Sequence, residues 1–173
     1  MRARNFQESE KATVQEDEKA TKDLLEFRKY LHRGKPGPHS YVVLLGLRTF
    51  DTGKLLKSVE EGLSYSAFER FQRNIELPVA VLTALVQIPL RTLTRRKEQG
   101  RLQPDESDRL VRASRIFGKA LELFEGDPEA ARSWLSASQT ALGGAIPLNI
   151  AKSELGAREV EKLIGRLEHG VFS

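Results

Sequence analysis

The sequence of 173 residues contains no cysteine, and its only methionine is Met1. Disulfide scaffolds, thiolate metal sites and cysteine nucleophiles are therefore excluded, and a reducing compartment fits this composition. The longest apolar run, Tyr41 to Leu47, is far too short to span a bilayer. Because the N-terminal stretch MRARNFQESEK also lacks the apolar core of a signal peptide, we expect a cytoplasmic protein without membrane segments.

Patterns that carry catalysis or bind metals are missing as well. The histidines His32, His39 and His169 are far apart in sequence and belong to no His-x-x-x-His or His-Glu metal motif. Gly143-Gly144 is not followed by the Lys-Ser/Thr pair of a phosphate-binding loop. We therefore expect no enzymatic activity, no metal and no cofactor.

What the sequence does contain is a series of short amphipathic segments separated by proline and glycine, with neither strand alternation nor internal repeats. After Pro104, apolar residues recur at helical spacing and predict one long helix; they are Leu110, Ala113, Phe117, Leu121 and Phe124. We predict an all-α fold in three parts. A charged N-terminal arm or frayed helix covers residues 1–38, a middle domain covers 39–102, and a small helical domain covers 103–173.

Residues 78–99 have the length of a helix-turn-helix, with prolines spaced as the starts of its two helices. Pro78 and Pro89 each suit the start of a short helix, and Ile88-Pro89 separates the two helices. A helix-turn-helix commonly has glycine in its turn, but Gln87 stands at that position. We expect Gln87 to adopt a left-handed conformation, at a strain of about 1 kcal/mol.

The second of these helices is basic, although the net charge of the chain is only +4. We expect Leu90 and Leu93 to face the core and the polar side chains to face DNA. Arginine can bind a guanine edge, and threonine can bind phosphate or a thymine methyl group. Arg101, just past the helix, suits a backbone phosphate. The candidate DNA-binding residues are Arg91, Thr92, Thr94, Arg95, Arg96, Lys97 and Arg101; the alternative is a solvated basic face.

A series of short strings in the C-terminal third is more specific. They are SDRL at 107–110, WL at 134–135, ALGG at 141–144, PL at 147–148, GAREV at 156–160 and GRLEHG at 165–170. With EEGLSYSAFERF and TLTRRKEQGRL in the middle part, this order resembles the Xre-type antitoxins of RES–Xre toxin–antitoxin systems, the ParS/Xre family. The resemblance spans roughly residues 40–173. Gln87 departs from the usual turn glycine, and Asn149 stands where aspartate is common.

The resemblance implies a type II antitoxin, usually dimeric, that represses its own operon through the helix-turn-helix and binds a RES-domain toxin with its C-terminal domain. The NAD-depleting chemistry belongs to that toxin, whose active-site entrance the antitoxin would cover. Rigid apolar anchors beside polar groups suit such an interface. The candidate toxin-binding residues are Leu142, Gly143, Gly144, Pro147, Arg158, Arg166, Glu168, His169, Val171 and Phe172.

Two alternatives stay open. A helix-turn-helix shape without DNA binding would make the chain a protein-interaction module, which Gln87 and the modest net charge favour. A stand-alone repressor without a toxin partner is the other alternative, and an orphan gene context would favour it. The partners expected under the main interpretation are a RES-domain toxin, operator DNA and a second copy of the chain.

Overall fold

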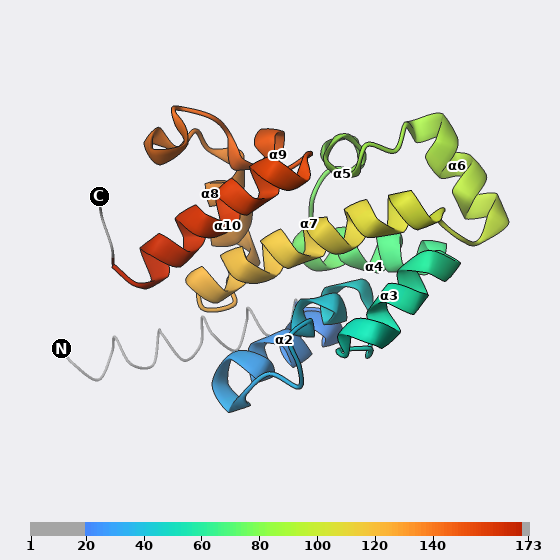
Figure 1. Ribbon diagram of the computed structural model, residues 1–173, viewed down its shortest axis with the longest axis horizontal. Helices are drawn as coiled ribbons and strands as arrows, with labels where there is room; N and C mark the ends of the chain where they lie inside the picture. Colours follow the sequence, from blue (N-terminus) through green and yellow to red (C-terminus); the bar gives the residue numbers. More distant parts are fainter. Residues whose placement is uncertain (1–19, 171–173) are drawn as a thin grey trace.

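The computed structural model describes residues 20–170, which form helices joined by turns and loops (Figure 1). In chain order these are α2 (Lys22–Arg33), η1 (Ser40–Leu45), α3 (Thr52–Glu61), α4 (Tyr65–Ile75), α5 (Val79–Val86), α6 (Leu90–Gln99), α7 (Pro104–Leu123), α8 (Pro128–Ser136), η2 (Thr140–Leu142), α9 (Pro147–Ile150) and α10 (Glu154–Glu168), where η marks a 3-10 helix. Within residues 20–170 the only β-structure is two isolated bridges. The predicted all-α fold is confirmed.

The long helix α7 crosses the middle of the molecule, with the N-terminal helices on one side and α8 to α10 on the other (Figure 1). Pro104 opens its first turn, and the Glu106 carboxylate accepts the backbone N–H of Gln103 at 2.8 Å. Leu110 and Phe117 are buried, and the ring of Phe117 meets that of Phe71 edge-on with 5.7 Å between centroids. The helix and apolar face predicted after Pro104 are thus confirmed.

The apolar run at residues 41–47 lies against α7. Its four central residues, 42–45, are buried in η1. A Cβ atom added to Gly118 of α7 would lie 2.6 Å from the Cβ of Tyr41, closer than real Cβ contacts come. Glycine at position 118 is therefore what allows η1 to approach the long helix.

The N-terminal helix α2 is docked onto the body by a buried carboxylate. Asp23 accepts hydrogen bonds from Arg70 at 2.6 and 3.0 Å and from Asn74 at 3.1 Å, and Arg48 lies 3.5 Å away. The Asn74 amide also donates to the Leu44 carbonyl at 2.7 Å. Residues 22–33 of the predicted arm are thus a packed helix, whereas residues 1–19 lie outside the described part of the chain.

One continuous apolar core joins the middle and C-terminal parts. It extends from Leu24 to Ile164 and includes residues from α4, α5, α7 and α10. The division expected near residue 102 stays a prediction: this residue lies in the link between α6 and α7, and α7 packs against η1 and α3 as well as α8 and α10. No helix within residues 20–170 is both long and apolar enough to cross a membrane.

Candidate functional sites

Helices α5 and α6 form the predicted helix-turn-helix. Gln87 ends α5 with φ 53° and ψ 43°, so the left-handed conformation expected at the turn is confirmed. The next residue, Ile88, is buried and donates its backbone N–H to the Thr83 carbonyl at 3.0 Å. Burial of Ile88 helps to hold the turn against the strain at Gln87.

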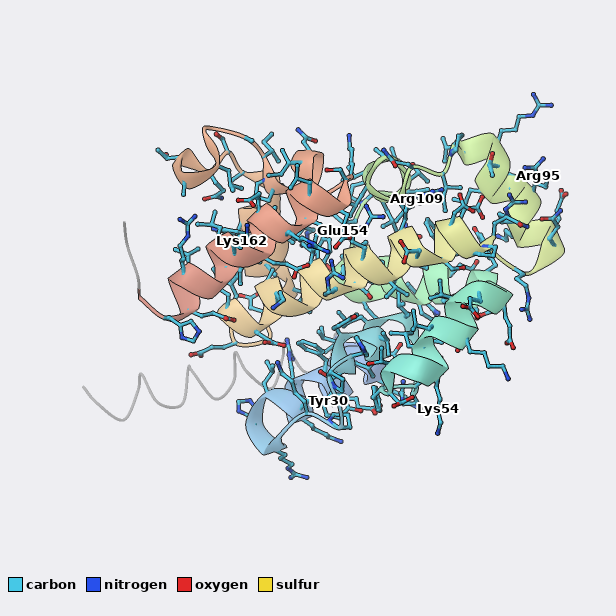
Figure 2. The ribbon with its side chains drawn as sticks, in the orientation of Figure 1. Tyr30, Lys54, Arg95, Arg109, Glu154 and Lys162 are labelled. Carbon is cyan, nitrogen blue, oxygen red and sulfur yellow. The ribbon has the colours of Figure 1, made fainter. Side chains whose placement is uncertain are left out.

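A contact from α7 fixes this turn to the body of the protein. The Arg109 guanidinium donates to the Val86 carbonyl at 2.7 Å and is also 3.0 Å from Asp105. Figure 2 shows Arg109 between α5 and α7. Because the last carbonyls of a helix lack partners within the helix, this bond satisfies one of them and ties the orientation of α5 to α7.

The outer side of α6 is exposed and basic. Arg91 and Arg95 point into solvent and make no hydrogen bond or ion pair within residues 20–170. Thr94 is exposed, Thr92 is partly exposed, and Lys97 is exposed with its ammonium 3.9 Å from Glu69. Helix α6 lies at one end of the molecule, where Figure 2 labels Arg95. This arrangement leaves two arginines available for a phosphate or a base edge.

Arg96 does not lie on that outer side, and its predicted role as a DNA contact is wrong. It is buried, donates to the Glu106 carboxylate at 2.7 Å and donates to the Gln99 side chain at 2.9 Å. The hydrogen bond that Arg96 donates to Glu106 raises the pKa of Arg96 above its ordinary value, so Arg96 keeps its charge. Arg96 follows Leu93 by three residues, which puts both on the inner face of α6.

The prediction for Leu90 is also wrong, in the opposite sense: this side chain was expected in the core, and it is 58% exposed. The buried face of α6 is centred between Leu93 and Arg96. At 3.6 residues per turn, Leu90 is rotated about 90° from that centre. Arg101, by contrast, is exposed and donates to the Glu61 carbonyl at 2.8 Å and the Gly62 carbonyl at 3.2 Å.

In the C-terminal part, the loop at residues 138–146 is ordered by its own hydrogen bonds. The backbone N–H of Gln139 donates to Ala145 at 3.0 Å, and Ser138 Oγ donates to the Gly144 carbonyl at 2.6 Å. Gly143 and Gly144 have φ of 66° and 83°, values that side chains other than glycine rarely adopt. The 138–146 loop is therefore preformed, and Leu142, in its middle, is partly buried against the core.

Helix α10 is held tightly to the segment before it. Ser153 caps its first turn through the backbone N–H of Gly156 at 3.1 Å. A Cβ at Gly156 would lie 1.8 Å from the Ile150 carbonyl oxygen, so no larger residue fits between α9 and α10. Ala157 and Val160 are buried against the core.

A cluster of charges joins α10 to α7. Arg115 donates to Glu161 at 2.6 Å and to Glu154 at 3.2 Å, and Arg112 approaches Glu154 at 3.3 Å. Burial alone would raise the pKa of Glu154, but its partners Arg158, Arg115 and Arg112 lower it below its ordinary value. Figure 2 shows Glu154 between the two helices. These ion pairs fix which side of α10 faces outward.

The outer side of α10 carries a shallow groove of about 420 Å³. We call it the α10 groove, and it is lined by Glu159, Lys162, Gly165, Arg166 and His169. Lys162 pairs with Glu159 at 2.7 Å, whereas Arg166 makes no ion pair within residues 20–170. Leu155 precedes the groove on the same helix and is 74% exposed. Sequence reasoning did not identify Leu155, because the side of α10 that is exposed is set by how this helix packs against the rest of the protein.

The predicted toxin-binding residues fall into three groups. Gly143, Gly144, Arg158, Arg166, Glu168 and His169 are exposed, and Leu142 is partly so. Pro147 is buried at the first position of α9, so its expected part as a contact is wrong and it instead starts that helix. Val171 and Phe172 lie outside the described residues. Over residues 20–170 no group of three or more His, Asp or Glu side chains is placed to hold a metal ion.

The comparisons with known proteins bear on both surfaces. Residues 54–115 match the antitoxin Xre-like helix-turn-helix domain, and residues 119–170 match the antitoxin Xre/MbcA/ParS C-terminal toxin-binding domain. The chain is 40% identical over 120 residues to an antitoxin Xre of Yersinia enterocolitica, covering 69% of this chain and 81% of that protein. The chain belongs to the Xre antitoxin family. It is 32% identical over 116 residues to an antitoxin Xre of Photorhabdus laumondii, covering 66% of this chain and 78% of that one.

This membership makes the chain a type II antitoxin rather than an enzyme, with a helix-turn-helix domain and a toxin-binding domain. A more distant relative, a Prs ADP-ribosylating antitoxin of Sphingobium, is 24% identical over 157 residues, 84% of this chain and 95% of its own length. The two domain matches meet between residues 115 and 119, inside α7. Helix α2 and η1 precede both matches. Of the Asp23 cluster, which is Asp23 with its partners Arg48, Arg70 and Asn74, the first two residues therefore lie outside the matched regions.

Proposed function

We propose that this antitoxin neutralises a RES-domain toxin by covering its active-site entrance with the α10 groove and the 138–146 loop. The observation that carries this proposal is the division of α10 into two sides. Its inner side is fixed by core packing and by the Arg115 ion pairs, while its outer side holds Leu155 and Arg166 without partners in residues 20–170. The two side chains lie on the same side of α10, about 16 Å apart along its axis, and an exposed leucine and an unpaired arginine so placed suit a protein interface.

The proposed inhibition is steric. The antitoxin supplies no reacting group, and the removal of NAD is chemistry of the toxin alone. Rigidity contributes affinity here, because a surface that is already ordered loses little conformational entropy on binding. The Gly156 contact with Ile150 and the hydrogen bonds of the 138–146 loop provide this order before any partner arrives.

We further propose that a homodimer represses the operon by placing α6 of each copy in a major groove. Two such helices would contact half-sites about 34 Å apart, one turn of DNA. Arg91 and Arg95 support this role, since they are exposed and unpaired within residues 20–170. They also favour a DNA-binding helix over an interaction module that has only the helix-turn-helix shape.

The two proposed surfaces lie apart. Figure 1 shows α6 at one end of the molecule, and the C-terminal end of α10 towards the other, with α7 running between them. A helix of 20 residues is about 30 Å long. The two proposed surfaces therefore do not share residues, and one copy presents α6 to DNA and α10 to the toxin.

Co-expression tests the toxin-binding half. The RES-domain protein encoded beside this antitoxin should stop growth alone and should be harmless with the wild-type antitoxin. The Lys162→Glu/Arg166→Glu variant should fail to restore growth, because it reverses the charge of the α10 groove. The matched control Arg91→Glu/Arg95→Glu should restore growth fully. Rescue by the groove variant equal to the wild type would contradict the proposed surface.

An electrophoretic shift with DNA from upstream of the operon tests the other half. The wild type should bind at low salt, and Arg91→Glu/Arg95→Glu should not. Absence of wild-type binding at low salt would favour the interaction module, and an operator bound without any neighbouring toxin gene would favour a stand-alone repressor.

A further inference from the structure

The exposed side of α6 carries an apolar strip that basic residues border. Leu90 is 58% exposed at the first position of the helix, and Thr94 lies one turn later on the same side. Arg91 and Arg95 each follow a member of the strip by one residue, about 100° further around the helix, so the two cations border the strip along one side. A single exposed leucine is ordinary on a protein surface, so it is the position of Leu90 on a basic helix, and not its exposure alone, that suggests a function.

The hydroxyl of Thr94 is already occupied. Its Oγ1 donates to the Leu90 carbonyl at 3.1 Å, within the helix. A hydroxyl has only one proton to donate, so Thr94 offers a partner its methyl group and acceptor lone pairs, but no free donor. Leu90 and Thr94 together therefore present alkyl groups, while Arg91 and Arg95 present hydrogen-bond donors.

We propose that Leu90 and the Thr94 methyl group bind thymine 5-methyl groups in the major groove of the operator. This inference rests on the proposed DNA-binding function and adds a base class to it. The methyl of thymine is the only apolar group on the base edges of the major groove, and small alkyl side chains contact it. The first residues of a recognition helix are those that reach base edges.

Charge argues for DNA over another protein as the occupant of this strip. Arg91 and Arg95 border it, and the ion pair between Lys97 of α6 and Glu69, with 3.9 Å between the two charged atoms, lies beyond the strip. Two unpaired arginines one turn apart on the same side of the helix fit the phosphates along one edge of a groove. A second copy of this surface would bring like charges together.

The test compares two forms of the same DNA. The region upstream of the operon is amplified once with dTTP and once with dUTP, so that the second product lacks every thymine methyl but keeps its base pairing. Burying one methyl group changes affinity about fourfold, and one such contact in each of two half-sites raises this to about fifteenfold. The wild type should therefore bind the uracil DNA about fifteenfold more weakly, or more weakly still where both Leu90 and Thr94 contact a methyl group.

Leu90→Ala should bind the thymine DNA more weakly than the wild type and lose most of the difference between the two DNAs. Thr94→Ser, which keeps the hydroxyl and removes the methyl, should reduce the difference in part. The matched control is Leu56→Ala, since Leu56 on α3 has the same 58% exposure and should leave the difference unchanged.

The outcomes separate the inference from the function on which it rests. Equal binding of both DNAs by the wild type, or an undiminished difference in Leu90→Ala, overturns the methyl contact while operator binding stands. Failure of the wild type to bind either DNA removes the proposed repressor function and this inference with it. A change in the oligomeric state of the DNA-free protein on Leu90→Ala would mean that a second copy covers the strip. That result would also overturn the inference.

Discussion

The Nε atom of Arg96 donates to Glu106 at 2.7 Å, and both side chains are buried where α6 meets the start of α7. The same carboxylate oxygen accepts the backbone N–H of Gln103, so one group closes the first turn of α7 and anchors α6. The third arginine of the basic run thus holds the helix in place, whereas Arg91 and Arg95 remain on the solvent side.

Arg96→Ala should lower the free energy of unfolding by about 3 kcal/mol, since removal of one partner leaves the Glu106 charge buried without compensation. Urea unfolding followed by circular dichroism measures this loss. Arg95→Ala is the neighbouring control and should leave the urea midpoint unchanged. An equal, small effect of both substitutions would mean that the Arg96 pair adds nothing to stability.

Arg95→Ala should instead weaken operator binding. A base contact would cost about 1–3 kcal/mol in the operator complex, and a phosphate contact would reduce the salt slope by about one. Affinities measured over a range of salt concentrations distinguish the two. Arg33→Ala, which removes an exposed arginine from the last turn of α2, should change neither value. If Arg95→Ala kept the operator affinity and the salt slope of the wild type, Arg95 would not be a DNA contact, and recognition would have to involve other residues.

Two glycines of α10 should respond in opposite ways to the same substitution. Gly156→Ala places a methyl group 1.8 Å from the Ile150 carbonyl and should destabilise the protein by about 1–3 kcal/mol. Gly165→Ala meets nothing within 4 Å and should stabilise the helix by up to about 1 kcal/mol. Thermal unfolding of both variants checks this pair. A stable Gly156→Ala variant would show that α9 does not need its close approach to α10.

Stability should fall in acid through Asp23. Burial alone would raise the pKa of this carboxyl, but the bonds from Arg70 and Asn74 bring it below its ordinary value. A carboxyl with a lowered folded pKa stabilises the protein above the unfolded pKa of about 4, and this contribution disappears as the pH falls through the folded pKa. The urea midpoint should therefore decrease below about pH 4.

Asp23→Asn supplies the comparison for that pH dependence. The variant should be less stable than the wild type at pH 7 and should lose less stability on acidification, because it has no proton to gain at this site. Asp108→Asn, at an exposed position, should keep the wild-type profile. Parallel profiles for the wild type and Asp23→Asn would contradict the role given to the buried carboxylate.

Local patterns were enough to predict the all-α fold, the long helix after Pro104 and the left-handed Gln87, because each depends on residues close in sequence. Arg96 and Leu90 were assigned to the wrong sides of α6. Which side is buried depends on where Glu106 of α7 meets the helix, and no periodicity within ten residues reveals that contact.

The Asp23 cluster lay beyond sequence reasoning for a similar reason. It brings Arg48, which follows η1, and Arg70 and Asn74, both on α4, around one carboxylate of α2. The candidate toxin-binding surface was predicted mainly from family resemblance, which supplied its exposed polar residues. The exposure of Leu155 and the burial of Pro147 became evident only from the packing of α9 against α10.

The central claim, that the outer side of α10 blocks a toxin's active site, is tested most directly by the toxin's own reaction. Purified antitoxin is titrated into the RES-domain protein encoded beside it, and NAD consumption is followed. The account predicts that consumption stops once the antitoxin saturates the toxin, and continues with the Lys162→Glu/Arg166→Glu variant. Continued NAD consumption with saturating wild type, or full inhibition by the variant, would contradict it.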